Sequence, residues 1–210
     1  MLDYGFYNMD CMDGMKQFPD KYFDLAIVDP PYGLGDRLVE GGHKKNPMEK
    51  YRKDYEGKRW DIAPNEAYFN ELFRVSKNQI IWGGNYFDLP PTRGIIAWDK
   101  RQMMPTFSRW EYAWSSFDRP AKMYERRSQE REGRFHPTQK PVALYKWLLE
   151  HYAKAGDKIL DTHVGSASSL VACRELGFKY VGFEIDPDYY AMAKKRLDAA
   201  EAQGNIFDFL

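Results

Sequence analysis

Residues Lys158–Val171 read K-I-L-D-T-H-V-G-S-A-S-S-L-V, and they set the fold class. The first residues predict a short buried strand over 158–160 that closes at Asp161. The loop after it carries one glycine, and Gly165-Ser166 predicts the opening of a helix. A tight turn between a strand and a helix brings free backbone N–H groups close to a ligand, which suits a nucleoside or a carboxylate.

A second acidic residue follows the next expected strand. The run Y-V-G-F-E predicts a strand over residues 180–184, so Glu184 stands at its end, 23 residues after Asp161. In Rossmann-like sites, an acid about 20 residues beyond the glycine turn binds both ribose hydroxyls. The fingerprint G-x-G-x-x-G is absent. The pair therefore indicates a nucleoside-type ligand, with a loop that binds nothing as the alternative.

Strands and helices alternate along the rest of the chain. We expect strands over residues 22–28, 78–83, 94–98 and 111–115, and helices over residues 67–76, 142–153 and 187–202. This alternation predicts an α/β fold with a mostly parallel sheet and helices on both faces. One catalytic domain over residues 1–210 is expected, with inserted segments at about 33–60 and 100–135.

Composition narrows the class of protein. The 210 residues are 43% hydrophobic and 16% aromatic, which is too apolar for a disordered chain. No stretch approaches the ~20 apolar residues of a membrane span, and residues 1–10 lack the basic start and apolar run of a signal peptide. Cys11 and Cys173 fit neither a zinc site nor a disulfide framework, so we expect two buried, reduced thiols and a cytoplasmic location.

Charge is unevenly distributed, although the formal net charge is zero. Residues 41–59 hold seven Lys or Arg against three acids, and residues 100–140 hold ten against five. Basic segments of this kind are typical of contacts with phosphates, and a solvated surface is the equal alternative.

The tetrapeptide Asp29-Pro30-Pro31-Tyr32 follows the expected strand over residues 22–28. Ligands of open α/β sheets bind beyond the carboxyl ends of strands. An exocyclic amine is a poor nucleophile because its lone pair is delocalised, so a catalyst must accept hydrogen bonds from its N–H groups. The Asp29 carboxylate and the stiffly held Pro30 carbonyl offer such acceptors. Tyr32 offers a face on which an unstacked base can lie, and a simple turn is the alternative.

Four segments of the chain form a set: Asp29-Pro30-Pro31-Tyr32, His136-Pro137-Thr138-Gln139-Lys140-Pro141, Asp161-Thr162-His163-Val164-Gly165-Ser166-Ala167 and Gly182-Phe183-Glu184-Ile185-Asp186. Together they closely resemble the N6-adenine and N4-cytosine DNA methyltransferase family. The tetrapeptide precedes the glycine loop, as in the circularly permuted beta class of these enzymes. The resemblance implies a Rossmann-like fold dependent on S-adenosylmethionine, whose methyl group passes directly to an exocyclic amine without a metal.

The resemblance also implies roles for single residues. Asp29, Pro30, Pro31 and Tyr32 would hold the target amine and base. The residues that would bind the cofactor are Asp10, Cys11, Asp29, His136, Thr138, Lys140, Asp161, His163, Gly165, Ser166, Glu184 and Ile185. Glu184 would bind the ribose, and His136 and Lys140 the methionine carboxylate. For His136 and Lys140, a phosphate contact or a surface position is the alternative.

The chain departs from the family at the glycine loop, which usually reads D-P-F-x-G-S-G. Thr162, His163 and Ala167 replace Pro, Phe and Gly. We expect His163 to take the place of an aromatic contact rather than to act in catalysis. Asp29, where other members carry Ser, favours adenine N6 over cytosine N4.

The two inserted segments are expected to contact double-stranded DNA. The candidates are Lys44, Lys45, Arg52, Lys53, Arg101, Arg109, Arg119, Arg126 and Arg127. Residues 100–135 are the better candidate for reading sequence, because arginine pairs with guanine in the major groove. We therefore expect a site-specific DNA adenine-N6 methyltransferase, monomeric or a homodimer. N4-cytosine methylation, methylation of RNA or a protein amide, and an inactive nucleic-acid-binding module are the alternatives.

Overall fold

The computed structural model of the chain describes residues 1–34, 61–102, 108–127 and 139–207. Within them, eight strands form one sheet in the order β1-β8-β7-β2-β3-β5-β4-β6. The strands are β1 (Gly5–Asn8), β2 (Phe23–Val28), β3 (Ser76–Trp82), β4 (Ile96–Asp99), β5 (Trp110–Ser115), β6 (Lys122–Glu125), β7 (Lys158–Asp161) and β8 (Lys179–Glu184). The helices are α1 (Cys11–Met15), α3 (Glu66–Val75), α4 (Val142–Tyr152), α5 (Ser168–Glu175) and α6 (Pro187–Phe207), with a 3-10 turn η2 (Gly84–Tyr86).

The sheet is mostly parallel, as expected. The neighbours β1, β8, β7, β2 and β3 run in one direction, and only β5 runs antiparallel to its neighbours among the described strands. Parallel strands end at the same edge of a sheet, which we name the carboxyl edge. Because β5 runs the opposite way, it begins at this edge with Trp110.

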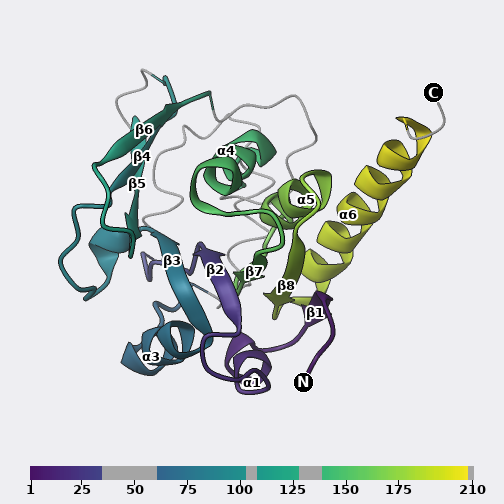
Figure 1. Ribbon diagram of the computed structural model, residues 1–210, viewed down its shortest axis with the longest axis horizontal. Helices are drawn as coiled ribbons and strands as arrows, with labels where there is room; N and C mark the ends of the chain where they lie inside the picture. Colours follow the sequence, from purple (N-terminus) through teal and green to yellow (C-terminus); the bar gives the residue numbers. More distant parts are fainter. Residues whose placement is uncertain (35–60, 103–107, 128–138, 208–210) are drawn as a thin grey trace, which may run out of the picture.

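Helices cover both faces of the sheet, so the α/β fold class is confirmed. Figure 1 shows α4, α5 and α6 on one side and α1 and α3 on the other. Successive side chains of a strand point to opposite faces. Leu25 and Ile27 of β2 therefore pack under the first layer, and Ala26 and Val28 under the second. Each fully buried Leu or Ile stabilises the fold by about 1.5–3 kcal/mol. None of the described helices is long and apolar enough to cross a bilayer.

Three elements differ from the sequence expectations because they lack an apolar run. The edge strands β1 and β6 have four residues each with partly or fully exposed side chains, and α1 has only five residues. The described part of residues 100–135, which we expected to be an inserted segment, contributes two strands to the sheet. Within their described part, β5 lies inside the sheet between β3 and β4, and β6 forms its edge.

The helix α5 begins at Ser168 rather than at the expected Gly165-Ser166. The reason is the backbone of Ala167, which takes the left-handed conformation (φ 61°, ψ 20°) and so delays the first helical turn. The glycine turn is therefore longer than the sequence pattern indicates.

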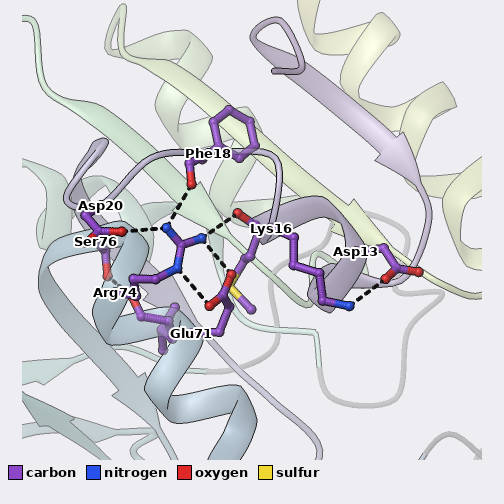
Figure 2. A network of polar contacts seen from close by, with 9 residues as sticks. Asp13, Lys16, Phe18, Asp20, Glu71, Arg74 and Ser76 are labelled. Carbon is purple, nitrogen blue, oxygen red and sulfur yellow. Dashed lines mark hydrogen bonds and ion pairs between the residues drawn. The ribbon is translucent and has the colours of Figure 1, made fainter.

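Arg74, at the end of α3, fixes the connection between α1 and β2 (Figure 2). Its guanidinium donates to Glu71 at 2.7 Å and to Asp20 at 2.8 Å. It also donates to the backbone carbonyls of Phe18 and Met15 at 3.0 and 3.2 Å. Charge-assisted bonds of this kind are stronger than neutral ones. They anchor the loop that leads into β2, and so the strand that positions the tetrapeptide.

Candidate active site

The carboxyl edge brings three of the acidic residues together. Asp29 directly follows β2, Asp161 ends β7 and Glu184 ends β8, and these three strands are neighbours in the sheet. Burial and the nearby carboxylates of Asp29 and Glu184 raise the pKa of the Asp161 carboxyl to about 7. Clustering of acids at strand ends is the arrangement expected of a ligand site in an open α/β sheet.

The tetrapeptide side chains are held in place. Tyr32 donates a hydrogen bond of 2.6 Å from its hydroxyl to Asp29 Oδ1. Its ring stacks on Tyr86 with a centroid distance of 4.8 Å and an interplanar angle of 16°. Gly83 has a left-handed backbone (φ 68°) and lies so close that a Cβ atom there would overlap the Tyr32 ring. The aromatic ring is therefore fixed beside the carboxylate.

Lys140 is buried against this carboxylate, with 3% of its side chain exposed. Its ammonium pairs with Asp29 Oδ2 and, at 3.2 Å, with Glu111 Oε2. Glu111 Oε1 in turn pairs with Lys100 Nζ at 2.7 Å. The ammonium also lies 5.2 Å from the centroid of the Trp82 ring. These groups form an alternating chain of carboxylates and ammonium groups, which we name the charge chain: Asp29, Lys140, Glu111 and Lys100.

The charge chain keeps Glu111 and Lys140 ionised. Burial alone would raise the pKa of the Glu111 carboxyl, but Lys140 and Lys100 outweigh it and lower that pKa to about 2. Burial alone would lower the pKa of Lys140, but Asp29 and Glu111 outweigh it and raise that pKa. A buried ammonium is tolerated where carboxylates compensate its lost hydration.

The glycine turn is bound to the end of β8. The Gly165 amide (φ 53°) donates 2.9 Å to Glu184 Oε2, and the Asp186 amide donates 2.9 Å to Oε1 of the same carboxylate. Asp161 accepts a bond of 3.0 Å from the His163 amide and another from the Ser169 hydroxyl. Burial raises the pKa of Glu184. The turn that presents backbone to a ligand is thus fixed from both sides.

The residues that depart from the family pattern connect this turn to α3. Thr162 Oγ1 lies 2.6 Å from the Tyr68 hydroxyl and 2.9 Å from His163 Nδ1. The His163 ring meets the Tyr68 ring edge-on at 5.4 Å. Burial lowers the pKa of His163 to about 4, so its imidazole is neutral near pH 7. The His163 side chain therefore packs as a neutral ring against Tyr68.

The N-terminal candidates lie at the same edge. Asp10 accepts a bond of 2.7 Å from the Met12 amide and so caps α1. The Asn8 side chain donates 2.7 Å to the Glu184 carbonyl, because β1 pairs with β8. Cys11 is only partly buried, unlike the buried thiol we expected, whereas Cys173 is fully buried. Burial and Asp10 raise the pKa of Cys11 to about 12, so the thiol stays protonated.

Two other cofactor candidates differ in exposure. Ile185 is 59% exposed directly after β8, where an apolar side chain is available to a ligand. Ser166 is buried, and its hydroxyl lies 3.1 Å from that of Ser168. Other candidates from the sequence lie outside the described residues: Lys44, Lys45, Arg52, Lys53, His136 and Thr138.

The described arginines that we expected to contact DNA lie at two opposite edges of the sheet. Arg109 directly precedes β5 at the carboxyl edge and binds Asp99 at 3.1 Å, and Arg101 binds Glu125 with Nε at 3.0 Å. Arg126 and Arg127 follow β6, which is parallel to β4 and so ends at the same edge. Arg119 follows the end of β5, at the opposite edge, and donates 3.0 Å to the His151 carbonyl. Arg119 is therefore not brought to the candidate site.

Several site residues have no role in the sequence expectations. Glu111 and Lys100 belong to the charge chain, and the one available signal is a charged residue at the start of the aromatic run W-E-Y-A-W. Tyr68 and Trp82 sit at apolar positions of α3 and β3 and are typical of the core in sequence. Their contacts with the site depend on the tertiary fold.

Comparison with known proteins shows a similarity over the second half of the chain. Residues 97–195 match the model of the N6/N4 methyltransferase family, described as DNA methylase. This part of the chain, residues 97–195, is similar to the DNA methylase family. The matched range contains the charge-chain residues Lys100, Glu111 and Lys140, and also the glycine turn and Glu184.

Two curated proteins match the chain over a short stretch. The type II methyltransferase M.HpaI of Haemophilus parainfluenzae is 42% identical over 64 residues, which are 30% of this chain and 20% of that protein. The type II methyltransferase M2.DpnII of Streptococcus pneumoniae is 41% identical over 64 residues, 30% of this chain and 24% of that protein. The matched stretch thus spans about a fifth to a quarter of the length of these relatives.

Solved structures share the fold over nearly the whole chain. The PvuII DNA methyltransferase, described as cytosine-N4-specific, has a TM-score of 0.62 at 13% identity and covers 95% of this chain and 92% of that one. The complex of M1.HpyAVI with SAM has a TM-score of 0.58 at 21% identity and covers 91% of this chain and 98% of that one. At these identities the likeness concerns the fold.

Proposed function

We propose that the chain is a DNA methyltransferase that transfers a methyl group from S-adenosylmethionine to the exocyclic N6 amine of adenine. The observation that carries this proposal is the meeting of two groups at the carboxyl edge. The Asp29 carboxylate with the Tyr32 ring lies beside the glycine turn that Glu184 holds. The similarity of residues 97–195 to the DNA methylase family and the names of the two curated relatives support DNA as the substrate.

The residues at the turn fit the cofactor. The Gly165 turn brings backbone close to a ligand, and each Glu184 oxygen keeps a second lone pair for a ribose hydroxyl. The exposed Ile185 side chain offers apolar surface for an adenine ring. S-adenosylmethionine supplies an electrophilic methyl group when bound. Contacts of Asp10, Cys11, Asp161, His163 and Ser166 with the cofactor stay predictions, as does the contact of Lys140 with its carboxylate.

The tetrapeptide supplies the chemistry toward the amine. Asp29 and the Pro30 carbonyl accept hydrogen bonds from the two N–H groups, which orients the nitrogen lone pair toward its target. The Tyr32 ring receives the unstacked base, a contact worth about 1–3 kcal/mol. Positioning two reactants in line supplies much of the rate in a direct displacement. The reaction therefore needs neither of the two cysteines as a nucleophile.

Asp29 at the first position of the tetrapeptide supports adenine N6, and cytosine N4 is the second candidate. The observation that favours the second candidate is the fold shared with the cytosine-N4-specific PvuII enzyme. Arg101, Arg109, Arg126 and Arg127 at the carboxyl edge would contact phosphates and base edges. A cytoplasmic location, a homodimer and the permuted beta class stay predictions.

The proposal is tested by exchanging Asp29. Asp29→Ala removes the acceptor for the amine, so methyl transfer to duplex DNA should fall by at least about 100-fold. Titration with S-adenosylmethionine should still show binding, because the Gly165 turn and the Glu184 carboxylate are intact. Asp118→Asn, an exposed acid far from the edge, is the control.

Parallel reactions with duplex DNA, RNA and protein separate the alternatives. Transfer to DNA that survives Asp29→Ala would show that the catalytic assignment is wrong. Cofactor binding with label only in RNA or protein would change the substrate class. Absence of cofactor binding would leave an inactive nucleic-acid-binding module.

A further inference from the structure

The target amine needs acceptor capacity on Asp29, and both Asp29 oxygens already have donors. Oδ1 accepts the Tyr32 hydroxyl at 2.6 Å, and Oδ2 accepts the Lys140 ammonium. A tightly paired ammonium withdraws electron density from the carboxylate and competes with an incoming N–H group. Each Asp29 oxygen keeps a second lone pair that can accept from the amine, and this bond is stronger when Lys140 yields part of its contact.

Glu111 offers the ammonium an alternative partner. Its Oε2 is 3.2 Å from Lys140 Nζ. A small shift of the Lys140 ammonium therefore moves its main contact from Asp29 to Glu111. The exchange keeps Lys140 paired throughout, which matters because an unpaired buried ammonium is costly. The Trp82 ring, 5.2 Å from the ammonium, gives it a further favourable contact during this shift.

The fold explains why Glu111 is available. β5 runs antiparallel to β3, so its first residues lie at the carboxyl edge beside the end of β3. Register places Glu111 opposite Trp98 of β4, one position before Asp99, and Lys100 then reaches Glu111 Oε1 at 2.7 Å. Lys100 thereby fixes the Glu111 carboxylate, and the side chain of Glu111 is only 28% exposed.

We propose that Glu111 is a positioning residue, which takes the Lys140 ammonium from Asp29 when the target amine binds. This inference rests on the proposed methyltransferase function and deepens its chemistry. Glu111 touches neither substrate nor cofactor in this scheme. It acts through Lys140, so that Asp29 is paired in the resting protein and free to accept from the amine in the reacting complex.

The test compares Glu111→Gln with the unchanged protein in single-turnover methyl transfer to duplex DNA. Glutamine cannot balance the ammonium, so Lys140 stays on Asp29 and the transfer rate should fall by about 10- to 100-fold. The dissociation constant for S-adenosylmethionine should change little. Glu111→Asp should restore part of the rate, and Glu175→Gln, which removes a surface ion pair with Lys146 on α4, should match the unchanged protein.

The pH profile separates positioning from a structural defect. Without Glu111, Lys140 loses one of the carboxylates that keep it protonated, so the ammonium of the variant releases its proton at lower pH. The deficit of Glu111→Gln should therefore narrow as pH rises. A merely unfolded fraction would leave the ratio of the two rates unchanged with pH, and that result would overturn the proposal.

A double-mutant cycle gives the second readout. If Glu111 acts through Lys140, the exchange Glu111→Gln should add little to Lys140→Met. Additive losses, or a Glu111→Gln rate equal to that of the unchanged protein, would overturn this inference alone. Absence of transfer by the unchanged protein to DNA, RNA and protein would overturn the proposed function as well, so the two failures are distinct.

Discussion

The Gly165 amide and the Glu184 carboxylate are joined by a hydrogen bond of 2.9 Å, which links the turn after β7 to the end of β8. The same carboxylate accepts from the Asp186 amide through its other oxygen. One side chain therefore fixes two backbone segments that face the proposed cofactor.

Glu184→Gln should weaken binding of S-adenosylmethionine by at least about tenfold. A glutamine side chain has one acceptor oxygen, so it cannot hold both amides and also accept from a ribose hydroxyl. Isothermal titration measures the effect, with the exposed Asp198→Asn as a control. Equal affinities for Glu184→Gln and the unchanged protein would contradict the assignment of the ribose contact.

Gly83→Ala should reduce methyl transfer by about tenfold or more while leaving cofactor affinity unchanged. A Cβ atom at this position overlaps the Tyr32 ring, so the ring must leave its place beside Asp29. A displacement of about 1 Å at a reacting centre costs up to about 100-fold in rate. Single-turnover rates at saturating cofactor provide the measurement.

Gly177→Ala is the matched control for Gly83→Ala. Gly177 has a similar left-handed backbone (φ 74°), but no atom lies within 4 Å of the added Cβ. An alanine at position 177 therefore introduces similar backbone strain but does not displace the Tyr32 ring. Equal losses of transfer in both variants would show that strain, rather than the position of Tyr32, is responsible.

Ala167→Gly should change the free energy of unfolding by less than about 1 kcal/mol, although Gly is usual in the family at this position. The left-handed Ala167 costs roughly 1–2 kcal/mol, which glycine would relieve. Glycine also loses a fully buried methyl group, worth about 0.8 kcal/mol, and increases the freedom of the unfolded chain by about 0.4–1 kcal/mol. The opposing effects nearly cancel.

Denaturant unfolding tests this balance, with Gly165→Ala for comparison. Gly165 has φ 53°, so alanine there should destabilise the protein by about 1 kcal/mol or more. A gain of several kcal/mol from Ala167→Gly would contradict the balance and show that the turn is strained.

Stability should fall as pH rises through neutrality because of Asp161. Burial first, then the nearby Asp29 and Glu184, raise its pKa from 3.8 to about 7. The folded protein therefore holds this proton more tightly than the unfolded chain does. The contribution of Asp161 is complete below about pH 4 and is lost as pH rises through about 7.

Asp161→Asn imitates the protonated acid, so its melting temperature should fall less between about pH 6 and about pH 8 than that of the unchanged protein. Thermal unfolding at these two pH values measures the difference, and Asp118→Asn should behave like the unchanged protein. An identical fall in all three proteins would refute the raised pKa.

Most of the fold follows from local sequence patterns. The apolar run of β2 and the helix α3 lie within about two residues of their expected bounds, because a buried strand and an amphipathic helix each have a characteristic period. Local sequence patterns do not predict the edge strands β1 and β6. Their side chains are partly or fully exposed, and pairing with the neighbouring strands places them in the sheet.

The candidate site is predictable where a motif marks a strand end. Asp29, Asp161 and Glu184 end neighbouring parallel strands, and sequence alone places each of them after a strand. Glu111 is not predictable in this way. It meets Lys140 only because β5 reverses direction beside β3, and no local pattern in the sequence specifies that reversal.

Analysis of the methylated nucleoside tests the proposed transfer to adenine N6 in DNA. Unmethylated duplex DNA is incubated with the protein and S-adenosylmethionine carrying a labelled methyl group, and the DNA is then digested to nucleosides for analysis. We predict label in N6-methyladenine, at least about 100-fold lower with Asp29→Ala. Label in N4-methylcytosine would change the target base. No label in any DNA nucleoside, despite measurable cofactor binding, would contradict the proposed function.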